Sequence, residues 1–232
     1  MNITWIEKGD RSTLASTIAD DVTNIIKRSI KEHDRASIAL PGGSTPIPFL
    51  KCLNSKDIQW EKLSVTLTDE RCVNTDDPNN NEAMIKEHLP NCQNGPFKSL
   101  NLNDLEPHES LQIATKNIMS IQRPFDVTIL GMGADAHIAS LFPHNEASMI
   151  GLDYDNDDLC IIVHPENVSP NVTRISQTLS SLLNSKQIYL YINGMNKKDA
   201  YEKALESHNA VEYPVSAVLH QNYCPVTVYW SS

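Results

Sequence analysis

A histidine and an aspartate stand two positions apart in a glycine-containing segment, and this pair is the strongest candidate for chemistry in the chain. The segment reads GMGADAH and ends with Asp135 and His137, directly after an apolar run. A histidine can take a proton from water near neutral pH, and a neighbouring carboxylate can hold its ring in one tautomer. A histidine in a loop is more often structural or solvated, which is how we interpret the other seven. Because His137 alone follows a predicted strand beside glycines and an acid, it is our candidate base.

The glycines of this segment do not form a dinucleotide-binding fingerprint. The third glycine of that fingerprint is missing, and no acidic residue ends the next predicted strand at the expected distance. The chain also lacks a G-x-S-x-G segment, which disfavours an esterase with a serine nucleophile. We therefore expect base-assisted chemistry without a nicotinamide cofactor.

The loop Gly42-Gly43-Ser44-Thr45 is a candidate phosphate cradle. It follows a predicted strand and precedes a proline suited to the first turn of a helix. Free backbone N–H groups, the positive end of the helix and the two hydroxyls can hold a phosphate without any charged side chain. An ordinary capped turn explains this loop about equally well when it is considered alone. The hypothesis needs support from other segments.

Three cations are candidates for contact with an anion. Arg71 ends the segment TDER, and an arginine binds phosphate through two parallel hydrogen bonds. An ion pair at a strand end is the alternative there, and the asparagines at 79–81 are interpreted as a helix cap with no catalytic role. Arg174 in SPNVTRIS and Lys197 in GMNKKDA lie near predicted strands or turns, although each alone is more often a solvated surface charge.

The composition limits the compartment and the partners. The 232 residues carry a net charge of 19 − 29 = −10, which repels nucleic acid and anionic lipid, so neither is an expected partner. Five widely spaced cysteines without a CxxC pair disfavour both a disulfide framework and a zinc ribbon, and they indicate a reducing compartment. Neither a signal segment nor a run long enough to span a bilayer is present. We expect a soluble, cytoplasmic protein.

Short β-rich runs alternate with longer segments of helical periodicity. Nearly unbroken apolar runs are typical of strands covered on both faces by helices. The predicted strands are 37–40, 64–68, 125–130, 159–163 and 187–192. The predicted helices are 13–33, 46–52, 81–89, 109–121, 179–183 and 197–207. Stretches 91–107 and 153–158 are predicted surface loops, and neither is a domain linker.

This order of strands and helices predicts a single α/β domain over 1–232, with three α/β/α layers and a mostly parallel, doubly wound, Rossmann-like sheet. In such sheets ligands bind beyond the carboxyl ends of the strands, where the candidate segments lie.

Taken together, these segments resemble the 6-phosphogluconolactonases, which share a fold with the glucosamine-6-phosphate deaminases. The resemblance runs from about residue 37 nearly to the end of the chain. Its blocks are LPGGSTP, TDER, GMGADAHIASLFP, SPNVTRIS, GMNKKDA and YPVSAVLH followed by VTVYW. An ordered set of blocks is more specific than any one of them.

The resemblance implies an enzyme of the pentose phosphate pathway that hydrolyses 6-phospho-D-glucono-1,5-lactone without a metal or organic cofactor, and it suggests a monomer. His137 would deprotonate the attacking water and Asp135 would orient it. The phosphate and ring oxygens would be bound by Gly42, Gly43, Ser44 and Thr45 together with Arg174 and Lys197, with Arg71 as a further anion contact.

The resemblance is incomplete at several positions. Ala136 stands where the family usually has glycine, and its Cβ would be costly if the backbone needs positive φ. Asn171 and Thr173 replace a usual lysine and proline, which predicts a lower substrate affinity.

Two alternatives remain open. Deaminases typically carry an acid where Phe142 stands and a tyrosine where Arg71 stands, so the deaminase alternative is minor. The other is a non-catalytic sugar-phosphate-binding paralogue, since fold alone does not establish function. The joint presence of the candidate base and the cations argues against it.

Overall fold

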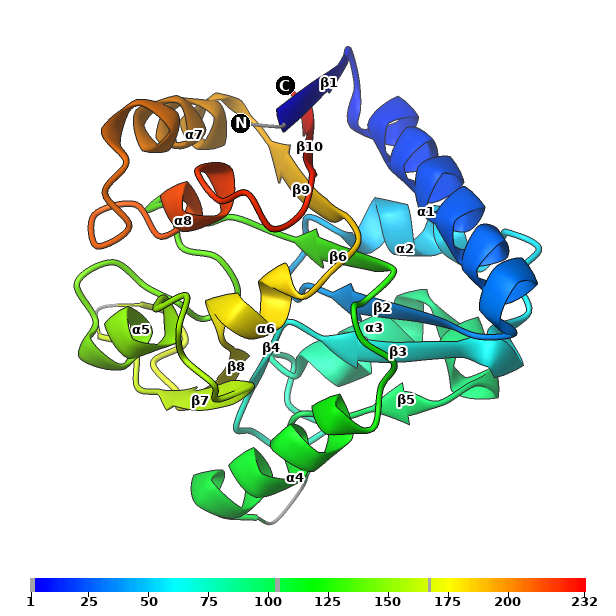
Figure 1. The fold of residues 1–232 in the computed structure, drawn as a ribbon, viewed down its shortest axis with the longest axis horizontal. Helices are drawn as coiled ribbons and strands as arrows, with labels where there is room; N and C mark the ends of the chain where they lie inside the picture. Colours follow the sequence, from blue (N-terminus) through cyan, green and yellow to red (C-terminus); the bar gives the residue numbers. More distant parts are fainter. Residues whose placement is uncertain (1–2, 103–104, 167) are drawn as a thin grey trace.

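A seven-stranded, wholly parallel sheet forms the centre of the computed structural model, which describes residues 3–102, 105–166 and 168–232 (Figure 1). The strand order is β1-β10-β9-β6-β2-β3-β5. The strands are β1 (Ile3–Lys8), β2 (Ala36–Leu40), β3 (Leu63–Leu67), β5 (Phe97–Lys98), β6 (Val127–Leu130), β9 (Ile188–Asn193) and β10 (Val226–Ser231). The chain moves outward from β2 through β3 to β5 and then returns to β6 on the other side of β2. The order therefore reverses between β2 and β6, where a doubly wound sheet opens a crevice for ligands.

Both faces of this sheet are buried, as β9 illustrates. Its sequence IYLYIN alternates, so Ile188, Leu190 and Ile192 join one apolar cluster while Tyr189 and Tyr191 join the other. Figure 1 shows α1 and α2 on one side of the sheet and α6, α7 and α8 on the other. The predicted three-layer, mostly parallel architecture is confirmed.

The helices begin where the sequence offers caps. Asp10 accepts a hydrogen bond from the Thr13 backbone N–H at the start of α1, and Asn80 caps α3 through the Ala83 N–H. The helices are α1 (Arg11–His33), α2 (Ile47–Asn54), α3 (Asn81–His88), α4 (Pro107–Met119), α5 (Glu146–Gly151), α6 (Leu179–Leu183), α7 (Met195–Ser207) and α8 (Val215–Leu219), with short 3-10 turns at Trp60–Lys62 and Pro90–Asn94. All six predicted helices are present within about two residues at each end, whereas α5 and α8 were not predicted.

A second, antiparallel sheet corrects one prediction. The run 159–163 is a strand, β7 (Cys160–Val163), but it pairs with β8 (Arg174–Gln177) and β4 (Asp69–Arg71) rather than joining the central sheet. The predicted loop 153–158 has no regular structure, whereas 91–107 also contains β5 and the start of α4; residues 103–104 lie outside the described part. Because β4 follows β3 after a single residue, this small sheet brings TDER and SPNVTRIS to the carboxyl edge of the central sheet.

In the described part of the chain, no helix is both long and apolar enough to cross a bilayer.

Candidate active site

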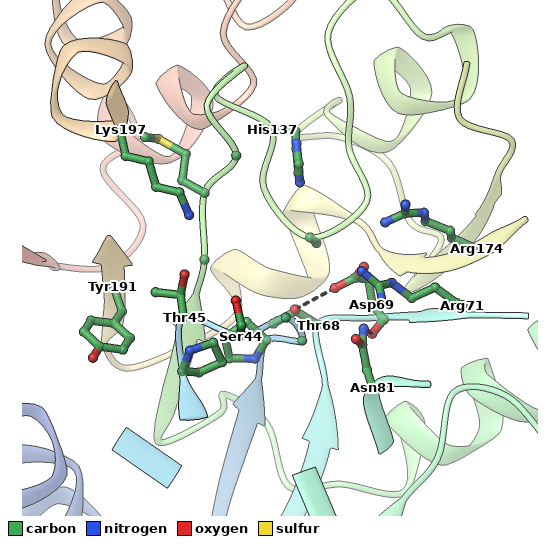
Figure 2. Close-up of a pocket in the computed structure, with 18 residues that line it drawn as sticks. Ser44, Thr45, Thr68, Asp69, Arg71, Asn81, His137, Arg174, Tyr191 and Lys197 are labelled. Atoms are coloured by element: carbon green, nitrogen blue, oxygen red, sulfur yellow. Dashed lines mark hydrogen bonds between the residues drawn. The ribbon is translucent and has the colours of Figure 1, made fainter. Parts of the chain in front are cut away.

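A cavity of about 270 Å³ lies at the carboxyl ends of β2, β3, β6 and β9. Every predicted site residue except Asp135 lines it, and Asp135 contacts the lining residue His137. Figure 2 shows the His137, Lys197 and Arg174 side chains reaching toward the cavity from one side and the Ser44 and Thr45 hydroxyls from the other. The lining residues are Pro41, Gly42, Gly43, Ser44, Thr45, Pro46, Thr68, Asp69, Arg71, Asn81, Gly131, Met132, Gly133, His137, Ala139, Arg174, Tyr191 and Lys197. The topology thus brings together segments more than 150 residues apart in the chain.

The loop after β2 has the free donors of an anion cradle. Gly43 has φ +83°, a left-handed conformation that favours glycine. Within the described residues, the backbone N–H groups of Gly43, Ser44 and Thr45 donate to no protein acceptor, and neither hydroxyl is engaged. Gly43, Ser44 and Thr45 line the cavity just before α2, whose first turn adds a positive end.

His137 and Asp135 form a close pair. The Nδ1 atom of His137 lies 2.6 Å from Oδ1 of Asp135, so the other ring nitrogen is left to face the cavity. Burial acts to raise the pKa of Asp135, but the hydrogen bond and charge of His137 outweigh it and hold that pKa below its usual value. Gly133 lies directly against the pair, because a Cβ there would fall 2.3 Å from atoms of both side chains. The second glycine of GMGADAH is therefore required by close approach.

Phe142 supports two site residues at once. Its ring, which is 5% exposed, lies 4.6 Å from the His137 ring, and the Arg174 guanidinium lies 5.1 Å from the Phe142 ring centre. Such ring and cation–ring contacts restrict how both side chains can turn.

Arg71 and Arg174 are paired across the small sheet. They are direct partners in the β4–β8 ladder, and the Nε atoms of both are buried without a hydrogen-bond partner in the described part of the chain. Burial and the charge of Arg71 both lower the pKa of Arg174. Like charges opposite each other on neighbouring strands are destabilising. Arg174 is 4% exposed, which excludes the alternative of a solvated surface charge.

Lys197, in the first turn of α7, supplies a further cation. Burial and the nearby charge of Arg11 lower the pKa of Lys197, whereas Asp135 acts to raise it. The cavity therefore contains three cationic side chains that are partly or largely withdrawn from water, an arrangement that favours an anionic ligand.

Sequence reasoning missed Asp69, Asn81 and Tyr191 as cavity residues. Asp69 belongs to TDER, in which the residue types favour Arg71, two positions further on, as the anion contact. The sequence indicates a helix cap among residues 79–81; the cap is Asn80, and the Asn81 side chain donates to the Asp69 carbonyl. Tyr191 looked like one more apolar residue of a buried strand.

Ala136 adopts the conformation that the sequence analysis expected to be costly. Its φ is +64° and it is fully buried. For Ala136→Gly, relief of about 1–2 kcal/mol of left-handed strain is offset by about 0.8 kcal/mol for the lost methyl group and about 0.4–1 kcal/mol of added unfolded-chain entropy. We expect the free energy of unfolding to change by less than about 1 kcal/mol.

A branched residue at this position should add backbone strain and a packing cost together. Ala136→Val should cost more than about 2 kcal/mol, because it combines a β-branched residue at positive φ with overpacking. Denaturant unfolding of both variants checks this; a valine variant as stable as the wild type would contradict the strained conformation.

The fold and the cavity define a doubly wound α/β protein with a cleft rich in cations and free N–H donors at its topological switch point. Residues 9–230 match the family model described as glucosamine-6-phosphate isomerases/6-phosphogluconolactonase, and the chain belongs to that family.

Individual relatives resemble the chain over its whole length. A Caulobacter vibrioides protein named 6-phosphogluconolactonase is 31% identical over 225 residues, covering 96% of this chain and 95% of that protein. A crystal structure of a 6-phosphogluconolactonase from Shewanella baltica OS155 has a TM-score of 0.94 at 32% identity, covering 99% of this chain and 98% of that one. A monomeric glucosamine-6-phosphate deaminase has a TM-score of 0.82 at 19% identity, covering 98% and 97%, which shows a common fold alone. The predicted family and fold relationship is confirmed.

Proposed function

We propose that this chain hydrolyses 6-phospho-D-glucono-1,5-lactone to 6-phospho-D-gluconate in the pentose phosphate pathway. The observation that carries the proposal is the full-length similarity to proteins named 6-phosphogluconolactonase. The His137–Asp135 pair beside a cation-lined cavity supports the same reaction.

The proposed mechanism uses backbone and side-chain groups of the protein and one water molecule. The phosphate binds the N–H groups and hydroxyls of the loop 42–45, together with Arg174, Lys197 and Arg71. His137 takes a proton from a water molecule that attacks the lactone carbonyl carbon, and Asp135 stabilises the resulting imidazolium. The ring C–O bond then breaks, and the imidazolium returns the proton to the departing oxygen.

The first experiment compares two activities of the purified protein. Lactone hydrolysis is measured with correction for spontaneous opening, in parallel with ammonia release from glucosamine 6-phosphate. Lactone turnover alone is the expected result. Ammonia release alone would replace the proposal with a deaminase activity, and silence in both assays would favour a non-catalytic sugar-phosphate-binding protein.

Replacing Asp135→Asn should lower kcat at least about tenfold, because an amide can hold the imidazole in the wrong tautomer and cannot stabilise its charge. Steady-state kinetics check this, with Asp157→Asn in the exposed 153–158 loop as the control. A normal kcat in the Asp135 variant would remove the orienting role.

The lowered pKa of Asp135 limits the pH range in which protonation of this carboxylate can affect stability or rate. Its contribution to stability is present above the unfolded-state value and is lost only as pH falls through the lower folded-state pKa. Above about pH 4, the carboxylate should therefore add no limb to the wild-type rate profile.

We also propose that the chain acts as one catalytic domain, as a monomer in the cytoplasm, with a small sugar phosphate as its partner. All five cysteines are free, in agreement with a reducing compartment. Sedimentation of the purified protein tests the monomeric state.

A further inference from the structure

Glu70 is a fully buried carboxylate between two cavity residues. Its neighbours on β4, Asp69 and Arg71, both line the cavity, whereas Glu70 is 0% exposed and does not line it. Successive side chains of a strand point to opposite faces, which places Glu70 on the side of β4 away from the cavity. A buried carboxylate is costly unless its oxygens are well bonded.

Backbone N–H groups supply those bonds. Oε1 of Glu70 accepts from the N–H of Arg71 at 2.7 Å and of Asn81 at 2.8 Å, and Oε2 accepts from the N–H of Glu82 at 2.7 Å. Within the described residues, Glu70 forms no ion pair with a lysine or arginine. The carboxylate therefore joins β4 to the first two residues of α3.

The first turn of α3 in turn contacts the phosphate cradle. The Asn81 amide donates to the Asp69 carbonyl at 3.0 Å, and a Cβ on Gly42 would lie 2.0 Å from the Asn81 side chain. On the same segment, Arg71 donates through Nη1 to the Asn79 carbonyl at 2.7 Å. Figure 2 shows Asn81 beneath the Asp69–Arg71 end of the cavity. A shift of residues 79–82 would therefore move both the Asn81 side chain that packs against Gly42 and the Asn79 carbonyl that binds Arg71.

We propose that Glu70 is a positioning residue for the phosphate end of this cavity. It acts through Asn81 and Arg71 and touches no substrate, and the inference rests on the proposed sugar-phosphate function. Burial raises the pKa of Glu70 to about 7, although the three N–H donors act to lower it. The charged form is therefore costly at this buried position, and the three hydrogen bonds hold the carboxylate there.

The test is Glu70→Gln, which keeps the shape but turns an NH₂ group toward a backbone N–H. We expect KM for the lactone and Kd for the product 6-phosphogluconate to rise about tenfold, as for one lost hydrogen bond to a charged group. We expect kcat to stay within about twofold, because the base is not touched.

Asp126→Asn is the matched control. Asp126 is a buried carboxylate, 1% exposed, that accepts from the Ser37 N–H and pairs with Lys186 at the start of β6, the opposite end of the sheet. We expect it to lower Tm as Glu70→Gln does, without changing KM or Kd.

A double-mutant cycle with Asn81→Ala tests the route. If Glu70 acts through Asn81, the change in log Kd of the double variant should be clearly smaller than the sum of the two single-variant changes. Full additivity would exclude the route through Asn81, and a Glu70 variant with lowered Tm and unchanged Kd would overturn the positioning role. Absence of lactone turnover in the wild type would instead defeat the proposed function, and 6-phosphogluconate binding by the variants would still decide the role of Glu70.

Discussion

His137→Ala should lower kcat for lactone hydrolysis by about 10²–10⁴-fold, the range contributed by a positioned general base. KM should change little, because the donors and cations of the cavity remain in place. The reason lies in the geometry: Asp135 binds Nδ1 at 2.6 Å, the Phe142 ring lies 4.6 Å from the imidazole, and the remaining nitrogen faces the cavity. Initial rates corrected for spontaneous opening, together with 6-phosphogluconate binding, separate the two parameters.

His33→Ala is the control for this change. His33 is an exposed residue at the last position of α1, and it does not line the cavity. Its loss should leave both kcat and KM unchanged. An undiminished kcat in the His137 variant would show that another group activates the water.

The strands and helices that were predicted correctly are those with strong one-dimensional patterns. Buried parallel strands such as β9 are continuous apolar runs, and α1 carries its apolar stripe from Leu14 to Ile30. The strands that the sequence analysis does not predict are the edge strands β1 and β5 and the short β4, with mixed or very short sequences, and also β8 and β10. Their strand conformation depends on partners far away in the chain, for which local sequence carries little signal.

The parts of the site that could be predicted are also those carried by a local sequence pattern. The loop 42–45 and the pair at 135 and 137 are local motifs, so their residue types already indicate their chemistry. The burial of Arg174 could not be predicted, because it follows from the pairing of β8 with β4 in a sheet that the sequence did not reveal. The contact of Phe142 with both His137 and Arg174 arises in the same way, from tertiary packing.

Arg174→Ala should raise KM for the lactone and Kd for 6-phosphogluconate by about 10- to 100-fold, the effect of removing a charge-assisted hydrogen bond to phosphate. The like-charged Arg71 is its cross-strand partner, and both have a buried Nε without a partner in the described residues. A phosphate between them would supply the missing acceptors and offset their repulsion. The kcat value should fall only slightly, through loss of the contact with Phe142.

The chain offers a matched control for this arginine. Arg123 also has a buried Nε without a partner in the described residues and stacks 4.0 Å above the Phe125 ring, but it bonds Ser181 and lies outside the cavity. Both alanine variants should therefore lose Tm through lost packing, while Arg174→Ala alone should weaken binding. Arg174→Lys should recover part of the affinity, because it restores the charge without the planar fork that binds two phosphate oxygens. If the Arg174 and Arg123 variants differed in neither KM nor Kd, the cross-strand arginines would be structural, and phosphate binding would have to rest on Lys197 and the loop 42–45.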